Sequence, residues 1–158
     1  MAPQLWLLRH GEAVPHESKP DADRELTARG ERQALAAGEG LARLGVEFAA
    51  CYTSPKVRAV QTARLACRAL SIEPEESRAL ENGFDSGDAR ELLLGHDDDA
   101  RVLAVGHEPS FSQVVYDLTG ARVDLKKGGV AAVRGDELLV LLRPRELESL
   151  ARGPTRES

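Results

Sequence analysis

Short apolar segments of strand length alternate along this chain with longer segments that have the pattern of amphipathic helices. Leu5–Leu8, Phe48–Tyr52 and Arg101–Gly106 are predicted strands, and the last has the continuous apolar character of a central parallel strand. No internal repeat or linker interrupts the alternation. The pattern therefore predicts an α/β fold, a three-layer α/β/α sandwich with a mostly parallel sheet.

Capping and breaker residues set the expected bounds of the helices. Thr27 is expected to cap a helix that ends at Gly45, and Ser54–Pro55 to begin a helix that runs to about Leu70. The inward face of the first helix is expected to carry Leu35, Leu41 and Leu44. The other expected elements are a short strand within Ile72–Leu80, a helix over Ser86–Leu94, a helix capped by Ser110 that runs to Leu118 and stops at Gly120, and a hairpin of Val130–Val133 with Leu138–Leu142.

The length of 158 residues indicates one domain, expected over residues 1–150, followed by a polar, frayed tail over 151–158. The composition of 42% hydrophobic and 30% charged residues is typical of a globular protein. The formal net charge of −5 argues against broad nucleic-acid binding, because phosphate neutralisation needs a basic face.

The two cysteines and the N-terminal segment bear on the compartment. Cys51 and Cys67 have no metal-ligand spacing and are expected to be buried thiols in a reducing environment. No basic region precedes the first apolar run, and no run approaches the roughly 18 apolar residues that read as a membrane span. The sequence predicts a cytoplasmic protein with no membrane partner, and it indicates no oligomeric state.

Three polar motifs directly follow predicted strands: Arg9–His10–Gly11, Ser54–Pro55 and Gly106–His107–Glu108–Pro109. Ligands of open parallel sheets bind beyond the carboxyl ends of the strands, so these motifs are expected to meet at one edge. Arg58, one turn into the helix after Ser54, would add a guanidinium beside the positive end of that helix, and the two together favour an anion. The plainer alternatives are a surface pair, an exposed helical arginine and a partly buried histidine.

Other uses of the histidines and lysines are weaker. A metal cluster of His10, His16 and His107 lacks carboxylate-rich spacing, and the neighbouring arginines would repel a cation, so no metal is expected. His16 and His96 lie in predicted loops and have no specific expected role. Lys126–Lys127 is expected to be an ordinary exposed pair, with contact to an acidic partner as the alternative.

Four segments, in this order, resemble the motifs of the histidine phosphatase superfamily: LRHGEA at 8–13, LTARGERQA at 26–34, SPKVRAVQTA at 54–63 and GHEP at 106–109. The resemblance spans residues 4–142 and is strongest to the compact SixA-like phosphohistidine phosphatases. It implies a phosphoglycerate mutase-like fold in which His10 attacks phosphorus and carries the phosphoryl group as phosphohistidine. Arg9, Arg58 and His107 would bind the phosphoryl oxygens, with no metal or cofactor required. Nearby arginines would keep the pKa of His10 low enough for a neutral nucleophile.

The proton donor is less defined by the resemblance. Glu81, after the third strand region, lies where many members place an acid, and Glu108 is its rival; either is equally explained as a surface glutamate. Sugar-phosphate mutases of the superfamily usually have Ser or Thr followed by Asn shortly after Arg-His-Gly, where this chain has Ala13, Val14 and Pro15.

Only about 20 residues separate Glu81 from the strand at Arg101, where larger members insert a lid domain. An open pocket favours hydrolysis of a phosphoryl group on a protein. We therefore expect a phosphatase acting on phosphohistidine in a protein. The alternatives are a phosphomonoesterase for sugar or nucleotide phosphates and a non-catalytic module that binds phosphoproteins.

Overall fold

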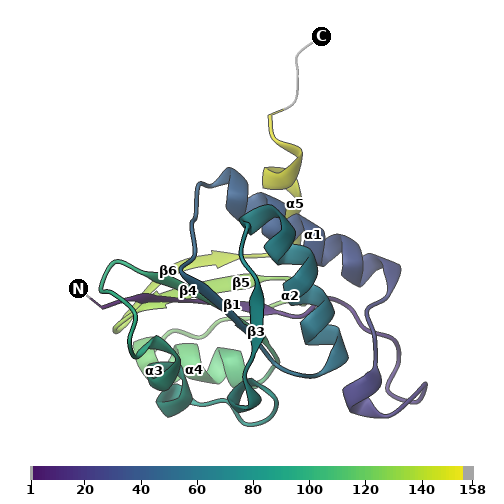
Figure 1. The fold of residues 1–158 in the computed structure, drawn as a ribbon, viewed down its shortest axis with the longest axis horizontal. Helices are drawn as coiled ribbons and strands as arrows, with labels where there is room; N and C mark the ends of the chain where they lie inside the picture. The colour runs from purple at the N-terminus through teal and green to yellow at the C-terminus, as the bar shows by residue number, and fades with distance from the viewer. Residues whose placement is uncertain (1, 155–158) are drawn as a thin grey trace.

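Six strands form one sheet in the order β3-β2-β4-β1-β5-β6 in the computed structural model, which describes residues 2–154 (Figure 1). The strands are β1 (Gln4–Arg9), β2 (Ala50–Thr53), β3 (Pro74–Glu76), β4 (Arg101–Gly106), β5 (Val130–Arg134) and β6 (Glu137–Leu142). The helices are α1 (Ala28–Arg43), α2 (Val57–Leu70), α3 (Ser86–Leu93), α4 (Ser110–Thr119) and α5 (Pro144–Arg152), with 3-10 turns η1 (Asp21–Asp23) and η2 (Arg78–Leu80).

The sheet is mostly parallel, as predicted. β1 pairs in parallel with β4, which pairs in parallel with β2, and β2 pairs in parallel with β3. The antiparallel part is the β5–β6 hairpin, whose β5 runs antiparallel to β1. Because parallel neighbours end at the same edge, the carboxyl ends of β1, β2 and β4 lie together.

Alternate residues of β1 point into two separate cores. Trp6 and Leu8 pack with Ala37 of α1, Ala63 of α2 and Leu147 of α5. On the other face the core joins residues of α3 and α4 to the sheet: Leu5, Leu7, Ala89, Phe111, Val114 and Val115. Helices α1, α2 and α5 therefore cover one face and α3 and α4 the other, which gives the predicted three layers (Figure 1).

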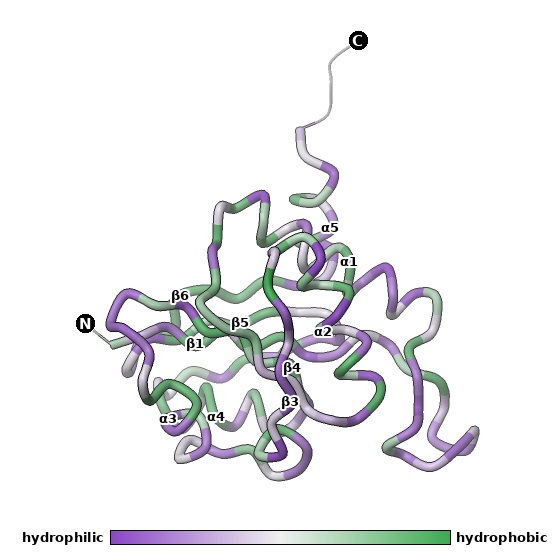
Figure 2. Tube along the Cα trace, viewed as in Figure 1, coloured by the Kyte–Doolittle hydropathy of each residue, from purple (hydrophilic) through white to green (hydrophobic). Residues whose placement is uncertain are grey.

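Hydrophobic residues are concentrated along the central strands, and most residues of the peripheral loops are hydrophilic (Figure 2). None of the helices within residues 2–154 is long and apolar enough to cross a membrane.

The first helix buries small residues where the sequence predicted leucines. Leu44 is 47% exposed and lies just past the end of α1, and Leu35 is only partly buried. A Cβ added at Gly38 would lie 2.2 Å from the Ala66 carbonyl oxygen, so the backbones of α1 and α2 are in close contact there. Such contact requires glycine and alanine on the shared face. Of the three predicted leucines, Leu41 is fully buried as expected, whereas Leu35 and Leu44 are not.

Two predicted helix caps were also wrong. Helix α2 begins at Val57 after Lys56, and Ser54 is fully buried with its hydroxyl used elsewhere. Ser110 is the first residue of α4 and does not cap it; the Glu108 carboxylate instead accepts a hydrogen bond from the Ser112 amide at 2.8 Å. A carboxylate in this place satisfies an amide that the helix itself leaves unpaired.

The C-terminal helix α5 was missed. Its amphipathic pattern buries Leu147 against α1, and Pro144 occupies its first turn. It includes Ala151 and Arg152, the first residues of the expected tail, while residues 155–158 of that tail lie outside the described residues.

Candidate active site

The strand register brings two histidines to one place. Arg9 is paired with Gly106 across β1 and β4, so His10 and His107 follow neighbouring strands at the same level. Their ring centroids are 5.1 Å apart. The predicted meeting of the strand-end motifs at one edge of the sheet is thus what the structure has.

His10 is buried and held in one orientation. It is 7% exposed, and its Nδ1 lies 2.7 Å from the Gly11 carbonyl oxygen. A carbonyl can only accept, so Nδ1 carries the proton and Nε2 has the lone pair. Burial lowers the pKa of His10 to about 3, opposed by the Gly11 hydrogen bond and reinforced by the charges of Arg58, Arg9 and Lys127. The ring is therefore neutral at physiological pH.

Arg58 lies in the first turn of α2 and points back toward His10. Its Nε donates to the His10 Nε2 at 3.3 Å, and its Nη1 donates to the Asp21 carbonyl at 2.8 Å. It is 5% exposed, which excludes the alternative of an exposed helical arginine. The guanidinium is thus fixed beside the nitrogen that has the lone pair.

Asp21 belongs to the 3-10 turn η1 before α1, and its carboxylate lies close to several cationic side chains. The sequence did not predict this role of Asp21. Its carboxylate lies 3.1 Å from Lys56 Nζ, 3.0 Å from Arg24 Nη2 and 3.4 Å from Arg58 Nη2. Partial burial opposes ionisation, but hydrogen bonds from Lys56 and Arg24 and the charge of Arg58 hold the pKa of Asp21 well below its usual value. His16 approaches the same carboxylate at 4.0 Å. No sequence motif signals this contact, because it joins an irregular loop to α2.

His107 is positioned by Ser54. Its Nε2 lies 2.8 Å from the Ser54 Oγ, and the same oxygen accepts from the Lys56 amide at 3.2 Å. The other ring nitrogen, Nδ1, is buried and has no hydrogen-bond partner among the described residues. Burial, with the charges of His10, Arg58 and Lys56, lowers the pKa of His107 to about 3. Ser54 belongs to a recognised motif, but the sequence predicted its side chain as a helix cap and not as a partner of His107.

Arg9 precedes His10 at the end of β1, and both residues line the same cavity. Its Nη1 donates to the Leu125 carbonyl at 2.9 Å, and its Nε is buried without a partner among the described residues. A buried donor without an acceptor costs about 1–3 kcal/mol. An anionic ligand with free oxygens would remove that cost for Arg9.

The backbone of the Arg-His-Gly segment is fixed by motif residues of α1 and α2. A Cβ at Gly11 would lie 2.5 Å from the Gly30 carbonyl oxygen, so only glycine allows this close approach. The Gly11 amide donates to Thr62 Oγ1 at 3.1 Å, and the Thr62 hydroxyl donates to the Arg58 carbonyl at 2.8 Å. Thr62 therefore ties the segment that carries His10 to the helix that carries Arg58.

A cavity of about 230 Å³ opens over these groups. It is lined by Arg9, His10, Ala13, His16, Arg24, Arg58, His107, Glu108 and Lys127. All four predicted phosphate-binding residues are among them. No group of three or more His, Cys, Asp or Glu side chains within residues 2–154 is arranged to hold a metal ion, so His10, His16 and His107 form no such cluster.

The two candidate acids differ in position. Glu108 lines the cavity, but its carboxylate accepts from both the amide and the hydroxyl of Ser112. Glu81 is not among the cavity residues; it follows η2 and precedes Asn82, whose Oδ1 accepts from Lys56 Nζ at 3.1 Å. The structure therefore brings Glu108 to the cavity and does not bring Glu81 to it.

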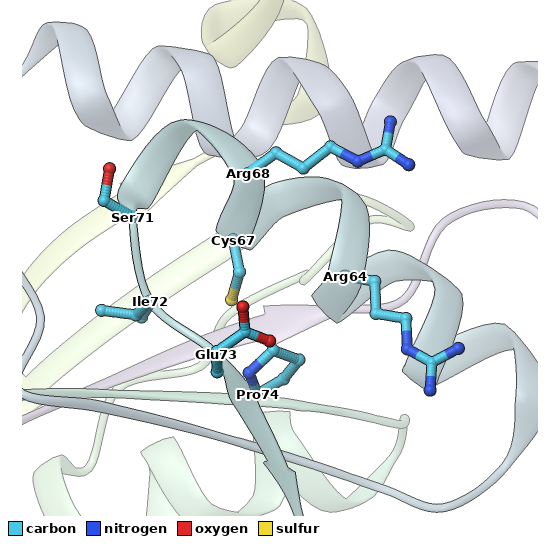
Figure 3. Close-up of a pocket in the computed structure, with 7 residues that line it drawn as sticks. All are labelled: Arg64, Cys67, Arg68, Ser71, Ile72, Glu73 and Pro74. Carbon is cyan, nitrogen blue, oxygen red and sulfur yellow. The ribbon is translucent and has the colours of Figure 1, made fainter.

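A second cavity, of about 450 Å³, lies at the C-terminal end of α2 and contains none of the predicted site residues. Figure 3 shows the Cys67 side chain directed towards Glu73 and Pro74, with the Arg64 and Arg68 guanidinium groups directed outward. Cys51 and Cys67 are both buried and free, as expected for reduced thiols. His96 lies in its predicted loop, with its Nε2 3.1 Å from the Tyr52 hydroxyl, and it does not line the cavity that contains His10.

The model of the histidine phosphatase superfamily (branch 1) matches residues 5–92, more than half of the chain. An uncharacterised protein from Picosynechococcus sp. is 30% identical over 162 aligned residues, which cover 91% of this chain and 98% of that protein. A 2,3-bisphosphoglycerate-dependent phosphoglycerate mutase from Caulobacter vibrioides is 40% identical over 67 residues, 40% of this chain and 28% of the mutase.

Solved structures share the whole fold. The protein histidine phosphatase SixA, in complex with tungstate, has a TM-score of 0.81 and 24% identity, with 91% of this chain and 99% of that chain covered. A phosphoserine phosphatase from Entamoeba histolytica has a TM-score of 0.73 and 16% identity, with 92% and 99% covered. The predicted phosphoglycerate mutase-like fold is confirmed by these likenesses, and together with the match to the family model they lead to one assignment: this chain belongs to the histidine phosphatase superfamily (branch 1).

Proposed function

We propose that this protein is a phosphatase that works through a covalent phosphohistidine on His10 and acts on phosphohistidine in a protein. The observation that carries the proposal is a neutral, buried imidazole whose Nε2 lone pair lies beside Arg58 in a cationic cavity. A neutral imidazole is a competent nucleophile, and cations at hand stabilise the charge spread over the transferred oxygens.

The reaction follows from the positions of these groups. The Nε2 lone pair of His10 forms a bond to phosphorus while the bond between phosphorus and the leaving nitrogen or oxygen breaks. The leaving group departs with that electron pair and takes up a proton. Water then attacks phosphorus, the bond to Nε2 breaks, and inorganic phosphate leaves. Arg9, Arg58 and His107 bind the equatorial oxygens throughout. The unpartnered Nε of Arg9 supplies one donor, and the unpartnered Nδ1 of His107 supplies another in the tautomer that has its proton on Nδ1.

The chemistry of the leaving group favours phosphohistidine over a phosphate ester as the substrate. An alkoxide needs a proton from a carboxylic acid, whereas an imidazole whose second nitrogen is protonated leaves readily. Glu108 is the one carboxylic acid among the described residues that line the cavity, and Ser112 already engages its carboxylate. The cavity volume is also below the roughly 300–1,000 Å³ of pockets that enclose a drug-sized ligand. A phosphoryl group fits, with its carrier outside. The two free thiols suit the cytoplasm as the site of action.

The test compares three substrates: a histidine-phosphorylated protein, p-nitrophenyl phosphate and a panel of sugar phosphates, each with and without EDTA. We expect the highest kcat/KM for the phosphoprotein and no effect of EDTA. His10→Asn is expected to abolish turnover, and a trapped phosphoenzyme of the wild type should be labile to acid and stable to alkali. His96→Asn is the matched control, because His96 contacts Tyr52 outside the cavity.

Turnover that survives His10→Asn would contradict the covalent role. Preference for a sugar phosphate would replace the proposed substrate class with a small ester. Phosphate binding without any turnover would identify a binding module.

A further inference from the structure

A surface groove adjoins the cavity that contains His10. It has a volume of about 410 Å³ and is lined by Arg9, Glu12, Arg29, Gln33, Lys126, Lys127 and Pro144. Arg9 and Lys127 line both spaces, so the groove and the cavity meet at these two side chains. The carrier of a group bound beside His10 would therefore lie next to this groove.

Hydrogen bonds from backbone amides connect both walls of the groove to the segment that carries His10. The Gly128 amide donates to the Arg9 carbonyl at 3.0 Å, and the Arg9 amide donates to the Gly129 carbonyl at 3.1 Å. On the other wall the Gln33 Oε1 accepts from the Glu12 amide at 2.9 Å. The segment that carries Lys126 and Lys127 is thus attached directly to the strand end that carries His10.

The charge of the groove is opposite to that of the protein. Four of its lining residues are cationic and one is a carboxylate, in a chain of net charge −5. The carboxylate, Glu12, is 3.8 Å from Arg29. Lys126 lies 2.7 Å from Asp124, a residue that does not line the groove. The charge of Lys127 contributes to the lowered pKa of His10. Cations collected at one concave place attract anionic partners and raise their association rate.

The exposure of these cationic side chains favours a protein surface over a small molecule as the partner of the groove. The Arg29 side chain is 71% exposed and the Lys126 side chain 55% exposed, and they come from α1 and from the loop before β5. Side chains so far into solvent cannot enclose a metabolite, but they can meet carboxylates on a surface that is laid against the site.

We propose that this groove, lined by Arg29, Lys126 and Lys127, docks a carboxylate-rich segment of the phosphorylated protein while its phosphohistidine lies over His10. The proposal rests on the proposed function and adds the chemistry of the partner. It revises the expectation that Lys126 and Lys127 are an ordinary exposed pair.

The test uses two peptides with one histidine each, phosphorylated with phosphoramidate. One has Asp and Glu flanking the histidine, and the other has Asn and Gln at the same positions. For the wild type we expect roughly three- to tenfold higher kcat/KM for the acidic peptide at low salt, falling as ionic strength rises. Arg29→Glu and Lys126→Glu should each remove most of that ratio.

Arg68→Glu is the matched control, because it makes the same change of charge on the exposed Arg68 of α2, at the other cavity. It should keep the ratio of the wild type. p-Nitrophenyl phosphate, which has no flanking segment, normalises each variant for folding and for the integrity of the phosphoryl site. Equal kcat/KM for the two peptides in the wild type, or an equal loss of ratio in Arg68→Glu, would overturn the docking proposal and leave the phosphatase proposal standing. Hydrolysis of p-nitrophenyl phosphate but of neither peptide would remove both the phosphohistidine substrate and the docking site.

Discussion

Acid should destabilise this protein through the two histidines of the site, well before its carboxylates titrate. Both imidazoles are neutral in the native state, and burial, nearly complete for His10 and partial for His107, lowers the pKa of each from 6.5 to about 3. The unfolded chain regains the ordinary pKa and so binds more protons than the native state below pH 6.5. The stability that the neutral rings contribute is therefore complete above that pH and is lost as the pH falls toward 3.

The size of the effect follows from the two pKa values. Each histidine should lower the free energy of unfolding by about 2 kcal/mol at about pH 5, relative to neutral pH. Together His10 and His107 account for about 4 kcal/mol, a large share of the roughly 5–15 kcal/mol by which proteins of this size are stable. Asp21, whose pKa is held well below its usual value, contributes only at lower pH, because an unfolded Asp titrates near about pH 4.

The assay is urea unfolding followed by the fluorescence of Trp6, the single tryptophan, which is 4% exposed. Unfolding free energies are measured between about pH 7.5 and pH 5 for the wild type, His10→Asn, His107→Asn and the double variant. Each single variant should lose about half of the pH dependence and the double variant most of it. A double variant with the same pH dependence as the wild type would refute the reasoning.

Three other changes test separate contacts. Ser54→Ala removes the hydroxyl at 2.8 Å from His107 Nε2 and should lower phosphatase kcat/KM roughly ten- to a hundredfold, the equivalent of leaving a buried polar group unpaired; steady-state kinetics with an unchanged value would show that Ser54 does not position the ring. Glu81→Gln should leave kcat/KM for a phosphohistidine protein within about twofold, since surface changes away from a site have small effects, and a loss of activity would restore Glu81 as the acid. Gly38→Ala places a Cβ 2.2 Å from the Ala66 carbonyl oxygen and should cost about 1–3 kcal/mol in urea unfolding; unaltered stability would mean that α1 and α2 can separate freely.

The predictable parts of the molecule are those fixed by local pattern. The continuous apolar run at 101–106 predicted β4, the two apolar runs at 130–133 and 138–142 predicted the β5–β6 hairpin, and strand-end motifs placed His10 and His107 at one edge. Helix α5 was missed although its amphipathic pattern and Pro144 are local signals. The buried face of α1, in contrast, depends on a distant partner. The small-residue face of α1 is set by backbone contact with α2, which no periodicity reveals.

The same distinction applies to the site. Arg58 could be predicted because a helix start aims its first turn at the strand ends. Asp21 could not, since its contact with Arg58 and Lys56 joins two segments through an irregular loop. Lys127 was equally hidden, because its approach to the site depends on hydrogen bonds between Gly128 and the end of β1.

The neighbouring position of β1 and β4 has an evolutionary consequence. The rung that pairs Arg9 with Gly106 sets the spacing of the two imidazoles, so the sheet determines the distance between His10 and His107. The loop at 94–100 joins α3 to β4 and contains no residue that lines the cavity, so an insertion there would leave this spacing unchanged. The outer surface can therefore diverge at such a loop while the two rings keep their arrangement.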